Sequence, residues 1–246
     1  MTDELYKRTG WLRRLAGRCL GVGPRNGEGT TLMRRADPDS VPLGPCEEGS
    51  LPHDSVCVFD VSGSMAWKDV VPCRLDAGKK AAEVYIRRRA ALSPGDRIGI
   101  VTFNRHGRIV LPLTEITRLD VILMCLASIR ATGGTDIGEG LKAANSLFAQ
   151  DVALNCTLGR YRRILVLTDG RGGDPLPWAT HLKSANVLIE VIGIGGDTSQ
   201  VDEATCRRIA TTDSNGVHYW FFRDTDGLVA HYENLADGLV FRGHDR

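Results

Sequence analysis

The chain has 246 residues, of which 42% are hydrophobic and 25% charged, a composition typical of a soluble globular protein. Its 31 basic and 30 acidic side chains leave a formal net charge of +1. This balance argues against a nucleic-acid-binding protein whose whole surface is basic. The longest apolar stretch is much shorter than the roughly 20 residues that a membrane-spanning helix needs, so we expect no transmembrane segment.

The charges are distributed unevenly along the chain. Residues 1–35 carry eight basic and three acidic side chains, whereas residues 36–246 carry 23 and 27. Within the segment 1–20, residues 4–20 can form a short basic amphipathic helix, which needs a surface to lie on. That surface could be its own domain, a protein partner, anionic lipid or nucleic acid. We therefore predict a second contact site in this segment.

Glycine and proline separate this basic segment from the rest of the chain. Residues 21–52 contain six Gly and five Pro, a composition typical of a linker or arm. We predict an N-terminal segment at 1–20, a linker at 21–53, a folded domain at 54–241 and a short tail at 242–246.

The chain has seven cysteines, an odd number, and no C-x-x-C spacing. Several lie among apolar residues, where a thiol behaves as a small hydrophobic side chain. This pattern favours reduced thiols over a disulfide framework or a zinc site. We therefore expect a cytoplasmic protein.

The first half of the domain alternates short apolar runs with helical patterns. Residues 55–60 and 96–104 are continuous apolar runs, typical of strands that are buried on both faces of a parallel sheet. Residues 107–113 predict a short antiparallel edge strand. Helices are predicted from apolar residues at helical spacing, and they lie at Leu75–Arg89, 117–129 and 137–150.

The second half repeats this scheme. We predict strands at 162–169, 186–195 and 218–222, and helices at 178–185, 201–211 and around Leu228, Tyr232, Leu235 and Leu239. Alternating strands and helices indicate a parallel sheet with right-handed crossovers. The predicted fold class is therefore a doubly wound, mostly parallel α/β sheet with helices on both faces.

Five oxygen-bearing side chains directly follow the predicted strands or precede a helix. We call them the oxygen-donor cluster, and they are Asp60, Ser62 and Ser64 in DVSGSM, Thr135 in TGGTD, and Asp169 in TDG. In doubly wound sheets, ligands bind beyond the carboxyl ends of the strands. Carboxylates and hydroxyls suit a hard cation, so we predict a Mg²⁺ site, with Mn²⁺ as an alternative. These five donors leave a coordination position of the ion open, and that position would attract an external carboxylate.

Each of these residues also has a purely structural interpretation. Ser, Thr and Asp are common at helix N-caps, and Asp136 before the helix at 137 fits that role or a supporting one next to the metal. The combination of five donors on three loops favours the metal site over five separate caps.

A metal-dependent enzyme is the main functional alternative. Asp60 and Asp169 could hold Mg²⁺ in a phosphohydrolase. Against this, Ser62 stands where a companion carboxylate would be expected, and no phosphate-binding glycine loop is present. Only His106 and His181 could face the site. A third alternative is a structural scaffold with an unoccupied site.

Several aromatic and basic residues lie on the same predicted loops. Such residue types often anchor protein interfaces, and those we assign to a partner-binding rim are Trp67, Arg105 and Arg171.

The strings DVSGSM, TGGTD and LTDG, in this order, resemble the metal-ion-dependent adhesion site of the von Willebrand factor A domain. The resemblance covers roughly residues 54–241. It implies that Ser62, Ser64 and Thr135 bind Mg²⁺ through their hydroxyls, that Asp60 and Asp169 supply carboxylates, and that a partner's Asp or Glu completes the shell.

The resemblance also implies a non-enzymatic protein-binding domain. The chain is similar to intracellular bacterial members of the family, which suggests an adaptor or scaffold beside an AAA+ ATPase, or in a tellurium-resistance-like stress module or defence system.

Overall fold

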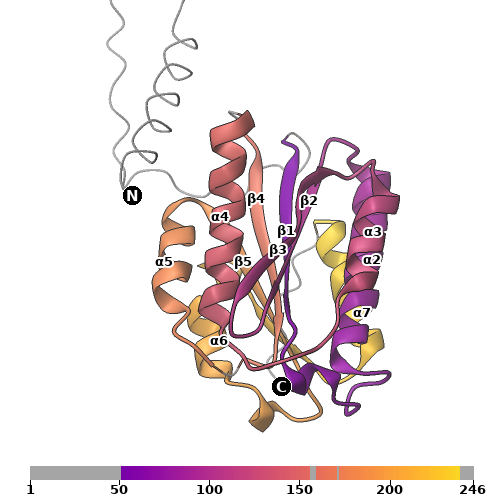
Figure 1. Ribbon diagram of the computed structural model, residues 1–246, viewed down its shortest axis with the longest axis vertical. Coiled ribbons are helices and arrows are strands. Elements are labelled where there is room, and N and C mark those ends of the chain that lie inside the picture. Colours follow the sequence, from indigo (N-terminus) through magenta and orange to yellow (C-terminus); the bar gives the residue numbers. More distant parts are fainter. Residues whose placement is uncertain (1–50, 156–158, 171, 239–246) are drawn as a thin grey trace, which may run out of the picture. The chain divides into compact units, whose positions relative to one another are not determined.

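A computed structural model describes residues 51–155, 159–170 and 172–238. The predicted basic helix, nearly all of the linker, Arg171, Leu239 and the C-terminal tail lie outside these residues. The fold below refers to the described part, which Figure 1 shows in colour.

The first strands form the centre and one edge of a six-stranded sheet. Strand β1 (His53–Asp60) pairs in parallel with β2 (Arg97–Phe103) and with β4 (Tyr161–Thr168). Strand β3 (Gly107–Glu115) runs antiparallel to β2 at the edge, which confirms the predicted antiparallel edge strand.

The other half of the sheet is built from later segments of the chain. Strand β5 (Val187–Ile194) pairs in parallel with β4, and β8 (Tyr219–Phe222) pairs in parallel with β5. The strand order is β3-β2-β1-β4-β5-β8. The chain first adds β2 and β3 on one side of β1 and then adds β4, β5 and β8 on the other side. The direction in which strands are added therefore reverses between β1 and β4.

Helices cover both faces of the sheet, as Figure 1 shows. One side carries α2 (Arg74–Leu92), α3 (Leu119–Ser128) and α7 (Thr225–Ala236). The opposite side carries α4 (Ile137–Asn155), α5 (Leu176–Ser184) and α6 (Glu203–Ile209). The doubly wound α/β fold class is confirmed.

The apolar run of β1 is continuous because both faces of this strand are buried. Cys57 and Phe59 belong to the hydrophobic core on the α2 side, whereas Val56 and Val58 belong to the core on the α4 side. Alternate side chains of a strand point to opposite faces, so a strand covered on both sides is apolar at every position.

Most predicted elements agree with the structure to within a few residues. Helix α4 extends to Asn155 rather than 150, and α5 begins at Leu176, next to two prolines that suit a helix start. Two 3-10 turns, η1 (Gly63–Ala66) and η2 (Thr198–Gln200), were not predicted. The same is true of a hairpin of β6 (Thr212–Asp213) and β7 (Gly216–Val217). In the described residues, no helix is long and apolar enough to cross a bilayer.

Candidate functional site

The oxygen-donor cluster lies where the strand order reverses. Asp60 is the last residue of β1, and Asp169 directly follows β4. These two strands are neighbours and run in parallel, so both carboxylates lie at the same edge of the sheet. The position agrees with the general rule for ligand sites in doubly wound sheets.

Asp60 is fully buried, and both of its carboxylate oxygens are hydrogen-bonded. The backbone N–H of Ser62 donates to Oδ1 at 2.8 Å, and the hydroxyl of Thr168 donates to Oδ2 at 2.8 Å. Burial raises the pKa of Asp60 to about 6, against hydrogen bonds from Ser62 that lower it, and the nearby Asp169 raises it further. The two carboxylates therefore repel each other, and a bound cation would relieve this repulsion.

The hydroxyls of the DVSGSM loop join the two carboxylates. The loop turns directly into η1, which lets Ser62 and Ser64 lie side by side with their Oγ atoms 3.1 Å apart. Ser64 also donates a hydrogen bond to Oδ2 of Asp169. Four of the five predicted donors thus form one connected group.

Thr135 reaches the same place on a loop that is held by backbone hydrogen bonds. Thr132 N–H donates to the carbonyl of Val61 at 2.5 Å, and Gly63 N–H donates to the carbonyl of Gly133 at 2.9 Å. Thr135 lines a cavity together with Ser64 and Asp169. The structure therefore brings all five predicted residues to one site.

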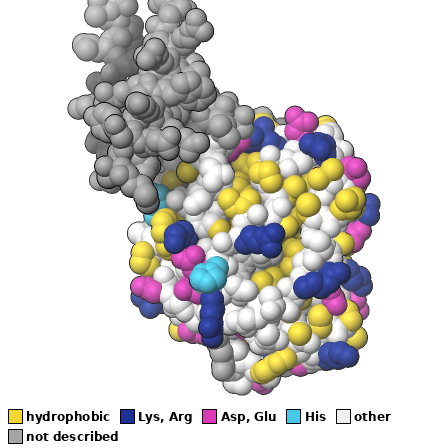
Figure 2. Space-filling model, viewed as in Figure 1, with side chains coloured by type: hydrophobic (Ala, Val, Ile, Leu, Met, Phe, Trp, Pro, Cys, Tyr) yellow, Lys and Arg dark blue, Asp and Glu magenta, His cyan; other side chains and the backbone are white. Residues whose placement is uncertain are grey.

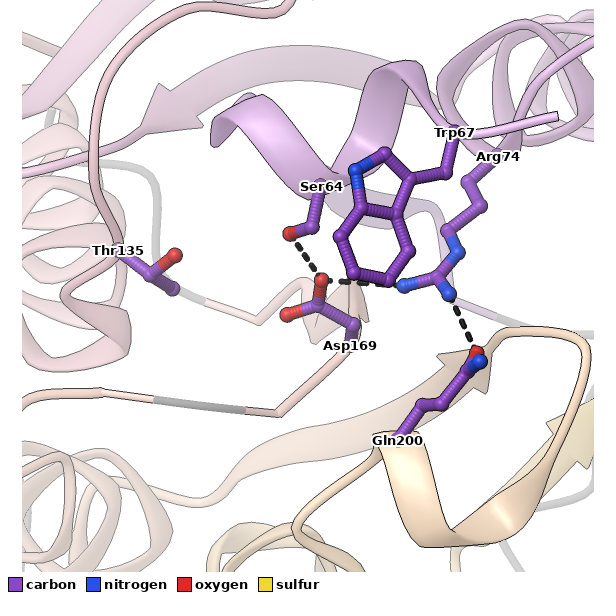
Figure 3. Close-up of a pocket in the computed structure, with 6 residues that line it drawn as sticks. All are labelled: Ser64, Trp67, Arg74, Thr135, Asp169 and Gln200. Carbon is purple, nitrogen blue, oxygen red and sulfur yellow. Dashed lines mark hydrogen bonds and ion pairs between the residues drawn. The ribbon is translucent and has the colours of Figure 1, made fainter. Parts of the chain in front are cut away.

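This cavity has a volume of about 290 Å³ and is drawn in Figure 3. Its six lining residues are Ser64, Trp67, Arg74, Thr135, Asp169 and Gln200. Trp67, which we predicted as a rim residue, is 54% exposed, and the Arg74 guanidinium carbon lies 4.9 Å from the centre of its ring. Trp67 is therefore available for contact with another molecule.

The other predicted rim residues are placed differently. Arg105 lies in a second hollow of about 530 Å³, with Asn104, His106, Gly133 and Gly134. The loop that carries Thr135 contributes to both hollows. Arg171 lies outside the described residues. Figure 2 shows basic and acidic side chains interspersed on one face of the described part, without a large area of a single charge.

The site also contains three residues that were not predicted from the sequence. Thr168 holds Asp60, Arg74 forms an ion pair with Asp169 at 3.3 Å, and Gln200 accepts a hydrogen bond from Arg74 at 2.6 Å. Thr168 could have been identified, because it is the polar end of an apolar strand next to Asp169. Arg74 and Gln200 carry no such signal.

Asp136 lies at the start of α4 and does not line the cavity. Its carboxylate accepts a hydrogen bond from the backbone N–H of Glu139 at 3.3 Å. This contact agrees with the capping interpretation of Asp136.

The donor set fits a hard divalent cation better than a soft one. It offers two carboxylates and three hydroxyls, and oxygen ligands of this kind suit Mg²⁺ or Mn²⁺. In the described part of the chain, no group of three or more His, Cys, Asp or Glu side chains could hold a metal ion. A cation at this site would therefore depend on hydroxyls as well as on its two carboxylates.

Part of the chain matches the profile of a known family. The family profile described as von Willebrand factor type A domain matches residues 55–171. A curated relative, the protein of Synechocystis sp. described as uncharacterized protein sll0103, is 31% identical over 155 residues. The match covers 61% of this chain and 34% of the relative, so the chain spans about a third of the length of that protein.

Solved structures with low sequence identity share the fold. BatB from Bacteroides thetaiotaomicron, described as a conserved hypothetical protein, has a TM-score of 0.60 at 21% identity, with 75% of this chain and 98% of that chain covered. The SpRpn10 VWA domain has a TM-score of 0.60 at 18% identity, with 80% and 99% covered. The profile match thus covers the segment from β1 to the loop after β4, and these structures show that the fold is shared.

Proposed function

We propose that the von Willebrand factor type A domain of this chain binds Mg²⁺, or Mn²⁺ in its place, through the oxygen-donor cluster and thereby holds an acidic side chain of a protein partner. The observation that carries the proposal is the convergence of Asp60, Ser64 and Asp169 from two neighbouring strand ends. The carboxylates are close enough for Asp169 to raise the pKa of Asp60.

The coordination of the ion leaves a place for an acidic side chain of a partner. Two carboxylates and neutral hydroxyls balance a divalent ion without filling all six positions that Mg²⁺ prefers. When bound, the ion would supply a Lewis-acidic position for a further oxygen ligand. Ser62, Ser64 and Thr135 would orient it, and the neighbouring cavity with exposed Trp67 leaves room for a side chain of the partner.

The domain would act as an adaptor or scaffold in an intracellular bacterial complex. An AAA+ ATPase, or a component of a tellurium-resistance-like stress module or defence system, is the partner class that the resemblance suggests. The described cysteines Cys57, Cys73, Cys125 and Cys206 are free thiols, which supports a reducing compartment such as the cytoplasm. The basic segment at 1–20 remains a second proposed contact site.

A phosphohydrolase is less well supported by the geometry. Neither of the histidines that we considered lines the cavity with Asp169, since His106 lies in the second hollow and His181 is in α5. Asp60, the candidate nucleophile, is fully buried, with both oxygens already hydrogen-bonded. A generic phosphatase assay with Mg²⁺ would test this alternative, and turnover that is lost in Asp60→Asn would favour it over binding.

The metal site can be tested by calorimetric titration of the chelator-treated full chain with Mn²⁺ and Mg²⁺. We expect saturable binding that is lost in Ser62→Ala and in Asp169→Ala. Ser146→Ala removes a hydroxyl that bonds the Lys142 carbonyl on α4, and this matched control should bind like the wild type. Equal binding by all four proteins would overturn the proposed site.

Partner binding requires a separate experiment. Immobilised full chain should retain a bacterial partner in Mg²⁺ and release it in EDTA, and Ser62→Ala should retain none. Retention that is the same with metal and with chelator would contradict metal-bridged recognition.

A further inference from the structure

A buried arginine side chain lies beside the oxygen-donor cluster and contacts Asp169. Arg74, at the start of α2, is 1% exposed, and its Nη1 lies 3.3 Å from Oδ2 of Asp169. The same oxygen accepts the hydrogen bond of Ser64, as Figure 3 shows. A fixed positive charge therefore contacts one of the two carboxylates that would bind a cation.

Asp69 balances this arginine on its other side. Nε of Arg74 donates to Oδ1 of Asp69 at 2.9 Å, and Nη2 forms an ion pair with Oδ2. Hydrogen bonding to Arg74 lowers the pKa of Asp69 to about 2, so this carboxylate is charged at neutral pH. The site thus contains two carboxylates that would bind a metal ion, the buried guanidinium of Arg74 and the carboxylate of Asp69.

The guanidinium is held from several directions. Nη2 also donates to Oε1 of Gln200 at 2.6 Å, and the Trp67 ring lies against the guanidinium. The backbone N–H of Gly196 donates to Oδ2 of Asp69 at 2.8 Å. Because these contacts come from the loops after η1 and after β5, the charge of Arg74 cannot move away easily when a cation arrives.

We propose that Arg74 is a positioning residue that limits the affinity of the oxygen-donor cluster for divalent cations, and that Asp69 sets how strongly it does so. The inference rests on the proposed function, because it concerns the same site. Arg74 orients Asp169 and offsets part of its charge, whereas Asp69 offsets the charge of Arg74. Coulomb interactions over these short distances are strong in a partly buried site.

This arrangement predicts opposite effects for the two halves of the ion pair. Arg74→Gln removes the repelling charge and should tighten Mn²⁺ binding by about ten-fold. Asp69→Asn leaves the arginine uncompensated and should weaken binding by about ten-fold. Arg74→Lys keeps the charge and should remain within about three-fold of the wild type, and the double variant Asp69→Asn/Arg74→Gln should return toward the wild-type value.

The experiment measures Mn²⁺ dissociation constants by calorimetry on the full chain, with circular dichroism to verify that each variant is folded. The matched controls are Arg87→Gln and Glu83→Gln, which break an exposed Arg–Glu pair farther along the same helix. Both should bind like the wild type. A general loss of structure would weaken binding in every variant, so it cannot produce the expected pair of opposite shifts.

The outcomes separate this inference from the proposed function. If the wild type binds Mn²⁺ and both single variants shift the same way or by less than three-fold, the role of Arg74 is wrong and the metal site stands. If only Arg74→Gln binds, Arg74 excludes cations from the natural site, which supports this inference and overturns the proposed function. If no protein binds, both are overturned.

Discussion

The hydroxyl of Thr168 donates a hydrogen bond of 2.8 Å to the buried carboxylate of Asp60, which links the ends of the two central strands β4 and β1. Thr168 also accepts a hydrogen bond from the backbone N–H of Gly170 at 2.9 Å. One side chain therefore orients Asp60 and the loop that carries Asp169. Groups that orient metal ligands in this way affect affinity without touching the ion.

Thr168→Val removes this hydroxyl and keeps the branched shape of the side chain. We expect Mn²⁺ affinity to fall by roughly 10–100-fold, because Asp60 loses the donor that fixes its orientation. Calorimetric titration measures the change. Thr168→Ser retains the hydroxyl and should remain close to the wild type, and equal affinities of the Val variant and the wild type would contradict this role.

His231 should make the domain sensitive to acid. It is buried next to the rings of Trp220 and Phe222, and burial lowers its pKa to about 4, with Glu190 raising and Arg163 lowering it. Because the folded state binds the proton less well than the unfolded state, stability is full above about pH 6.5 and is lost as the pH falls toward 4.

His231→Phe removes this proton-binding group and keeps an aromatic ring. Urea unfolding at pH 7 and pH 4.5 should show that the variant loses about 2–3 kcal/mol less stability than the wild type between these values. His53 has a pKa that is also lowered to about 4, mainly by burial, so some acid sensitivity should remain. If His231→Phe had the same pH dependence as the wild type, protonation of His231 would not be the cause of the acid sensitivity.

His218 should have the opposite pH dependence. Burial alone would lower its pKa, but Glu190 and Asp213 outweigh burial and raise it, and Nε2 lies 2.9 Å from Oδ2 of Asp213. This contribution to stability is present below about pH 6.5 and is lost as the pH rises through the raised pKa. His218→Gln should therefore cost more stability at pH 5.5 than at pH 9 in the same unfolding assay, and an equal cost at both values would refute the ion pair.

The buried pair of Arg163 and Glu190 should be necessary for stability. The two side chains are 4% and 1% exposed, and Nε of Arg163 lies 3.2 Å from Oε2 of Glu190. Glu190→Gln leaves the guanidinium without its counter-ion and should reduce the free energy of unfolding by about 3–5 kcal/mol. The double variant Arg163→Met/Glu190→Gln removes both charges and should recover part of this loss. A loss below about 1 kcal/mol in the single variant would contradict the prediction.

Gly107, the first residue of β3, permits close contact between that strand and α4. A Cβ atom at this position would lie 2.1 Å from the backbone carbonyl oxygen of Glu139. Gly107→Ala should therefore destabilise the domain by about 2 kcal/mol or more, since the helix must move. At Gly95 the nearest atom would be 3.7 Å away, so Gly95→Ala is the control for unfolding measurements and should have little effect.

Much of the fold could be predicted because hydrophobic periodicity reflects burial. Ile137, Leu141, Ala144 and Phe148 were expected on one face of a helix, and all four are buried in the same core. The short elements were missed for a physical reason. The two-residue strands β6 and β7 and the turn η2 have too few residues to show a period.

Of the functional site, only the candidate metal ligands could be predicted from the sequence. Asp60, Ser62 and Ser64 are close in sequence and lie at the end of an apolar run, so their place at the carboxyl end of a strand could be predicted. Arg74 looked like any other basic residue near the start of a helix. Its importance comes from contact with Asp169, 95 positions away in the sequence.

The alternation of apolar runs with helical patterns determined by itself that this chain forms a doubly wound α/β domain, since burial on both faces of a sheet requires continuous apolar runs. The overall charge of +1 excluded a uniformly basic surface but said nothing of local charge. Only the tertiary structure decided that a buried arginine and a further aspartate lie beside the oxygen-donor cluster. The physical reason is that electrostatic interactions depend on distance in space and on burial, and a composition records neither.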